Sequence, residues 1–168
     1  YQWEALNDNI PDAEPSHALA NYRIAAGLED GQFYGMVFQD SDVTKWLEAV
    51  AWSLSQKPDA TLEQTADEVI ELLAKAQCAD GYLNTWYTVK EPGQRWTNLA
   101  ECHELYCAGH LFEAAVAFYN ATGKRRLLEI SGRFADYIDT VFGPKPGQLR
   151  GYPGHPEIEL ALMRLYEV

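Results

Sequence analysis

Residues 40–77, DSDVTKWLEAVAWSLSQKPDATLEQTADEVIELLAKAQ, decide the fold class. Their hydrophobic side chains recur every three or four residues, which is the spacing that places them on one face of an α-helix. These positions are Val43, Trp46, Leu47, Val50, Ala51 and Leu54, and then Leu62, Ala66, Val69, Ile70, Leu73 and Ala76. The stretch therefore predicts two amphipathic helices, joined by a short connection at 56–60.

Polar residues at suitable places mark where these helices begin. Asp40 or Ser41 can cap the first helix, since short polar side chains accept hydrogen bonds from the free amides of a first turn. Thr61 and Gln64 have the spacing of a capping box at the start of the second. Asp80-Gly81 is expected to stop it.

The same signals predict further helices along the rest of the chain. Asn98 with Glu101 three residues later opens a helix expected to run to Asn120, and another covers 124–142 until Gly143-Pro144. A last helix begins with Pro156 in its first turn and continues to the end. A weaker one is expected over 17–27. The fold class is therefore all-α.

The connections between these helices alternate in length. Those at 56–60 and 121–123 are short, whereas 77–97 and 143–155 are long and rich in glycine, proline and aromatic residues. Short connections join antiparallel neighbours, so the helices form hairpins, and the long loops gather at one end. That end is the expected binding rim, because binding groups concentrate on loops held by a rigid scaffold.

The two long loops contain a weak internal repeat, since GYLN at 81–84 and GYPG at 151–154 each precede a hairpin. Open helical arrays repeat every 34 to 47 residues, roughly, with short turns throughout. The spacing of about 70 residues favours a closed barrel of helical hairpins, although similar loops could decorate a bundle.

Composition excludes several classes of partner. The formal charge of −12 and the absence of a basic stripe argue against nucleic acid. No stretch of 18 uncharged apolar residues is present, so a membrane partner is not expected either. Cys78, Cys102 and Cys107 are an odd number, which favours free thiols in a reducing compartment and hence a cytoplasmic location. Because the chain starts at Tyr1 and stops within a helical pattern, we expect a fragment.

Residues 100–110, AECHELYCAGH, raise the question of a metal site. On a helix His103, Cys107 and His110 would share one stripe, but the two histidines would be about 10.5 Å apart along the axis, too far to share an ion. No paired-cysteine or metalloprotease motif accompanies them, so a zinc site within the chain is not expected. Cys107 is interpreted as a small core residue and His110 as a hydrogen-bonded core histidine.

His103 and His155 differ, because both fall at the proposed rim. Either alone would be read as an ordinary exposed or capping histidine, but their shared position suggests a binding site. Aromatic residues occupy the same loops, where they could stack on sugar rings or merely pin the loops: Tyr82, Trp86, Tyr87, Trp96 and Tyr152. Rim carboxylates that could instead serve as helix caps are Asp40, Asp42, Glu101 and Glu104.

Four stretches together carry a family resemblance. They are GMVFQDSDVTKWLEAVAWSL, DGYLNTWYTVKEPGQRWTNL, ECHELYCAGHLFEAAVAFYNATGKRRLL and GYPGHPEIELAL. Over residues 21–168 the chain resembles the amino-terminal half of the catalytic domain of the glycoside hydrolase family 127 β-L-arabinofuranosidases. HELYCAGH and GYPGH are the most specific parts of the match.

The resemblance implies an (α/α)6 barrel followed by β-sandwich domains, with 1–168 a single partial domain of the barrel. It implies a retaining hydrolase that releases L-arabinofuranose from β-linkages, with a zinc-bound cysteine as nucleophile and a glutamate as acid/base. Those residues and the zinc ligands would lie beyond this chain, so the fragment alone is expected to bind no zinc and to be inactive. Only His103 and His155 match positions that contact the sugar. A non-catalytic carbohydrate-binding module and a helical interaction scaffold remain the alternatives.

Overall fold

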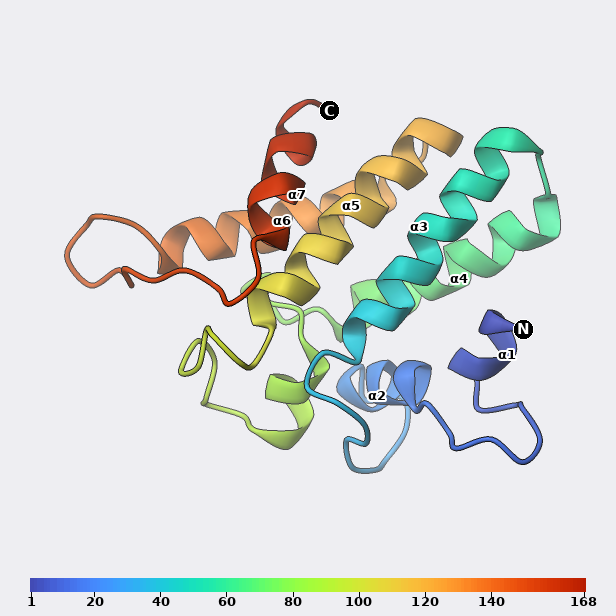
Figure 1. Ribbon diagram of the computed structural model, residues 1–168, viewed down its shortest axis with the longest axis horizontal. Helices are drawn as coiled ribbons and strands as arrows, with labels where there is room; N and C mark the ends of the chain where they lie inside the picture. Colours follow the sequence, from blue (N-terminus) through green and yellow to red (C-terminus); the bar gives the residue numbers. More distant parts are fainter.

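The computed structural model describes all residues 1–168, and its elements are helices joined by short turns and long loops (Figure 1). Its elements are α1 (Gln2–Leu6), α2 (Ala18–Ala25), α3 (Asp40–Gln56), α4 (Ala60–Ala76), the π-helix η1 (Trp86–Lys90), α5 (Glu104–Thr122), α6 (Arg126–Val141) and α7 (Glu157–Tyr166). The sole β-type pairing is one isolated bridge between Phe142 and Leu149. The predicted all-α class is confirmed.

Helix α5 is the centre of the structure, with α3, α6 and α7 packed around it (Figure 1). A helix that is apolar on all sides is suited to such a position. The buried residues of α5 cover most of its circumference and include Leu105, Cys107, Ala108, Leu111, Phe112, Ala114, Ala115 and Phe118. The stripe of Tyr106, His110 and Ala117 is half-buried. By contrast, α4 and α6 bury one face each, as the periodicity of their sequences predicts.

The hairpins share one orientation. Figure 1 shows the tight turns after α3 and after α5 together at the upper right, while the long connections before α5 and α7 lie at the lower left. The predicted separation of short turns from long loops is therefore confirmed. The weak helix expected over 17–27 is α2. The short helices α1 and η1 were not predicted.

Three predicted helix starts are wrong. Gln39, not Asp40 or Ser41, occupies the cap position of α3, and no side chain caps its first turn. The cap of α4 is Asp59, whose carboxylate accepts from the amides of Thr61 and Leu62 at 3.0 Å each. The helix expected from Asn98 begins only at Glu104. Asn98 instead accepts from the amide of Glu101 at 3.1 Å and closes an isolated turn.

Gly109 allows α7 to begin close against the middle of α5. A Cβ atom at this position would lie 3.0 Å from the backbone carbon of Glu157 and 3.0 Å from the amide nitrogen of Ile158. A side chain would therefore push the start of α7 away. None of the helices has both the length and the apolar character needed to cross a membrane.

Candidate functional site

The two histidines selected from the sequence meet at the long-loop end. Nε2 of His155 lies 3.0 Å from Nε2 of His103, and the ring centroids are 4.8 Å apart. His103 immediately precedes α5, and its backbone is left-handed with φ 57°. His155 is exposed in the loop before α7, 52 positions away in the sequence. The predicted convergence is confirmed, while contact with a sugar stays a prediction.

The two loops that carry these histidines touch through their backbones. The amide of Gly154 donates to the carbonyl of Leu99 at 3.2 Å. A Cβ atom on Gly151 would lie 2.7 Å from the side chain of Leu99, so this glycine also permits close approach. The glycines of GYPGH therefore lie at the contact between the loop of His155 and the loop of His103.

The hydrogen bonds of the pair define its tautomers. Nδ1 of His103 contacts the carbonyl oxygen of Glu101, which can only accept, so Nδ1 carries the hydrogen in the neutral ring. Nε2 of His103 is then an acceptor, and His155 donates its Nε2 hydrogen to it. The Nδ1 atom of His155 has no partner within the chain and remains available to a ligand.

Glu104 is not a rim carboxylate, contrary to the prediction. Its side chain is 1% exposed, accepts the hydroxyl of Tyr82 at 2.5 Å and accepts the backbone amide of Trp96 at 2.6 Å. Burial raises its pKa to about 7, against the lowering effect of these two donors. Glu104 therefore ties the long loop to the first turn of α5, next to His103.

Asp40 has a similar internal role at the start of α3. Its carboxylate accepts the backbone amide of Thr85 at 2.7 Å and also accepts the Thr85 hydroxyl. Burial raises its pKa to about 6. Asp42 and Glu101 are exposed, as expected for rim residues.

The structure decides between the two roles left open for the loop aromatics, and three of the five stabilise the loops from within the core. Tyr82, Tyr87 and Trp96 are buried in the hydrophobic core. Trp86 is partly buried, with Nζ of Lys90 4.0 Å from its ring centroid. Tyr152 alone is largely exposed, at 84%.

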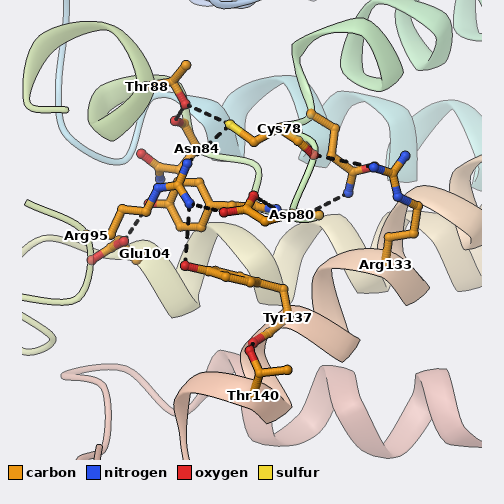
Figure 2. A network of polar contacts seen from close by, with 12 residues as sticks. Cys78, Asp80, Asn84, Thr88, Arg95, Glu104, Arg133, Tyr137 and Thr140 are labelled. Atoms are coloured by element: carbon orange, nitrogen blue, oxygen red, sulfur yellow. Dashed lines mark hydrogen bonds and ion pairs between the residues drawn. The ribbon is translucent and has the colours of Figure 1, made fainter. Parts of the chain in front are cut away.

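Arg95 ties the long loop before α5 to helix α6, as Figure 2 shows. Its guanidinium lies 3.8 Å from the ring centroid of Tyr82, which suits a cation–π contact. It donates to Asp80 at 2.7 Å, to the hydroxyl of Tyr137 in α6 at 3.4 Å and to the sulfur of Cys78 at 3.3 Å. Sequence reasoning missed this network, because Arg95 carries no local signal of its partners.

The three cysteines are free and have separate surroundings. Cys107 is buried in the core, and burial raises the pKa of its thiol well above the usual range. Cys78 lies beside Arg95 and Cys102 is partly buried. No three histidine, cysteine, aspartate or glutamate side chains come together as a metal would require, so these residues alone would not hold the zinc whose ligands the family resemblance places elsewhere in the enzyme.

His110 is half-buried and not fully hydrogen-bonded, which corrects the prediction. Its Nδ1 lies 3.4 Å from Oε1 of Glu157 but has no hydrogen bond of acceptable geometry. Burial lowers its pKa to about 4, so the ring is neutral at pH 7.

Comparison with known proteins shows to which family the chain belongs. The sequence model described as β-L-arabinofuranosidase, GH127 catalytic domain, matches residues 1–168. This chain belongs to the GH127 family. The non-reducing end β-L-arabinofuranosidase of Bifidobacterium longum subsp. longum is 45% identical over 183 residues, which cover 99% of this chain and 28% of the length of that enzyme.

Solved GH127 structures have the same fold over this region. A GH127 β-L-arabinofuranosidase from Geobacillus stearothermophilus is 71% identical, with a TM-score of 0.98 over 99% of this chain and 26% of the solved one. A second GH127 β-arabinofuranosidase is 35% identical, with a TM-score of 0.89 over 99% of this chain and 26% of the solved chain. The chain thus spans about a quarter of the length of these GH127 proteins.

Proposed function

We propose that this chain forms the amino-terminal part of the catalytic domain of a glycoside hydrolase that releases L-arabinofuranose from β-linked arabinofuranosides. In this proposal His103 and His155 hydrogen-bond the sugar. The observation that supports it best is the meeting of two imidazoles from distant loops at the long-loop end of a GH127 domain. Their chemistry fits a sugar, since the free Nδ1 of His155 can accept a hydrogen bond from one hydroxyl group, and a second hydroxyl group can replace His155 as the donor to Nε2 of His103.

The surroundings of His155 leave room for a ligand. A pocket of about 410 Å³ lies beside it, lined by Tyr106, His155, Pro156, Glu157, Glu159 and Leu160. Its lining combines an aromatic ring with carboxylates and an imidazole, the mixture that orients a small polar ligand. Membership of a hydrolase family favours this function over a non-catalytic carbohydrate-binding module or an interaction scaffold.

In this proposal residues 1–168 bind and orient the sugar but do not cleave the glycosidic bond. Retaining cleavage needs a nucleophile and an acid/base on opposite sides of the anomeric carbon, and we place both outside residues 1–168. When bound by other parts of the enzyme, zinc would activate a cysteine thiolate. Here the histidine pair holds sugar hydroxyls, and the buried carboxylates Glu104 and Asp40 hold the loops that carry the site.

We also propose a barrel architecture for the complete domain and a cellular location for the enzyme. The hairpins would be part of an (α/α)6 barrel, with 1–168 a partial domain of it. The cytoplasmic location rests on the three free cysteines.

The test is a pair of asparagine substitutions in a full-length GH127 enzyme carrying these 168 residues. Asparagine tolerates the left-handed backbone of His103, so His103→Asn removes the imidazole with little backbone strain. We expect His103→Asn and His155→Asn each to lower kcat/KM on a chromogenic β-L-arabinofuranoside about 10- to 100-fold, as loss of a hydrogen bond to the substrate predicts. The isolated 168 residues should release no arabinose.

His17 provides a matched control. It also precedes a helix and also has a left-handed backbone, with φ 54°, but it lies by Asp8 and Tyr34, away from the pair. His17→Asn should keep kcat/KM within about twofold. Unchanged activity in both site variants, or equal losses in all three, would refute the sugar-binding role.

A further inference from the structure

Tyr106 contacts both histidines of the site. Its ring centroid lies 5.5 Å from that of His103, at an interplanar angle of 86°, and 5.3 Å from that of His155, at 50°. Phe38 also lies near His103, at 5.2 Å, but has no contact of this kind with His155. Tyr106 is therefore the aromatic ring that the two loops share.

The ring of Tyr106 is itself held from two sides. Nζ of Lys45 in α3 donates to its hydroxyl at 2.7 Å and lies 4.9 Å from its ring centroid. Lys45 also donates to the hydroxyl of Ser41 at 3.2 Å, which fixes the ammonium group. On the other side His110 packs edge-on at 4.5 Å. Because α3 and α5 share the most extensive helix–helix contact of the fold, the position of the ring is set by the scaffold rather than by the loops.

The histidines, in contrast, have few restraints of their own. The side chain of His103 is bonded to the Glu101 carbonyl, and His155 is exposed and bonded only to His103. A displaced imidazole would lose the geometry on which sugar binding depends. Resting on the function proposed above, we propose that Tyr106 is a positioning residue, whose ring holds His103 and His155 in contact.

The test separates the ring from the hydroxyl in the full-length enzyme. Tyr106→Leu removes the ring, and we expect kcat/KM to fall at least about tenfold, mostly through KM. Tyr106→Phe keeps the ring and loses only the bond to Lys45, so its loss of kcat/KM should be clearly smaller than that of Tyr106→Leu. Tyr119→Leu is the control, because Tyr119 is a partly buried tyrosine of the same helix whose ring faces Arg125.

A crystal structure of the Tyr106→Leu variant tests positioning without reference to activity. We expect the two Nε2 atoms to move out of hydrogen-bond distance, and an intact contact would overturn the proposal. An equal loss of activity in Tyr106→Phe would overturn it too, since the hydroxyl and not the ring would then matter. A loss in Tyr119→Leu as large as in Tyr106→Leu would also overturn it, as a sign of general destabilisation.

Combining Tyr106→Leu with the two histidine substitutions distinguishes the positioning role of Tyr106 from the proposed sugar-binding function. In an enzyme that already lacks both imidazoles, Tyr106→Leu should lower kcat/KM no further, because there is nothing left to position. A further tenfold loss in that background would give Tyr106 an independent role and refute the inference. If the histidine variants are fully active but the Tyr106→Leu crystal structure shows the pair separated, the positioning inference stands and the sugar-binding function fails.

Discussion

A Cβ atom added to Gly154 would lie 2.1 Å from the carbonyl oxygen of Ala100. The loop before α7 and the loop before α5 therefore meet backbone to backbone, one residue before His155 and three residues before His103. Only glycine permits such an approach, since a clash with a backbone atom cannot be relieved by rotating a side chain. The pairing of the histidines thus depends on a residue that carries no functional group.

Gly154→Ala should separate the two loops. We expect kcat/KM of the full-length enzyme to fall at least about tenfold, because displacement by about 1 Å is costly at a binding site. The free energy of unfolding should fall by about 1 to 3 kcal/mol, as for other overpacked sites. Gly132→Ala in α6 is the control, since a Cβ atom there meets nothing within 4 Å. Activity unchanged in both variants would contradict this account of the loop contact.

Gly109→Ala tests the packing of α5 against α7. The new methyl group would meet the backbone of Glu157 and Ile158 at 3.0 Å each, so α7 must shift. Although alanine favours a helix by about 1 kcal/mol over glycine, the clash should outweigh this gain. Differential scanning calorimetry should therefore show a lower unfolding midpoint, whereas Gly132→Ala should show an equal or higher one. A raised midpoint for Gly109→Ala would mean that α7 is free to move.

The helices and the meeting of the two histidines could be predicted from the sequence, because both follow from local patterns. Hydrophobic periodicity marks helices, and the alternation of loop lengths places His103 and His155 at the same end. Burial of polar groups could not be predicted in this way. The hydroxyl of Tyr82 donates to Glu104 although the two residues are 22 positions apart in the sequence, and no local pattern indicates this pairing. The role of the loop aromatics was left open for the same reason, since tertiary packing decides whether a ring faces a ligand or the core.

Helix starts were less predictable than helices, because adjacent polar residues compete for the same amides. Asp59→Ala should remove the cap of α4 at a cost of about 1 kcal/mol. The expected readout is amide exchange of Thr61 and Leu62, which should accelerate about fivefold. Thr61→Ala should leave it within about twofold, because its hydroxyl caps no amide here. Faster exchange in Thr61→Ala than in Asp59→Ala would restore the capping box expected from the sequence.

Glu104 gives the domain a pH dependence whose sign follows from its pKa. Burial raises that pKa to about 7, from the 4.5 of an exposed glutamate. Between these values the folded state keeps a proton that the unfolded chain has released, so stability is fully present below about pH 4.5 and is lost as pH rises towards 7. Glu104→Gln stays neutral throughout and should therefore gain stability relative to the parent over this window, by about 2 to 3 kcal/mol.

The measurement is the difference in unfolding midpoint between the parent and Glu104→Gln, taken at about pH 4.5, 6 and 7.5. His110 acts with the opposite sign, because burial lowers its pKa to about 4 and stability from this group rises with pH up to about 6.5. His110 is present in both proteins, so its contribution cancels in the difference. A difference that stays constant with pH would show that Glu104 is ionised in the folded state, and the Tyr82 and Trp96 bonds would then outweigh burial.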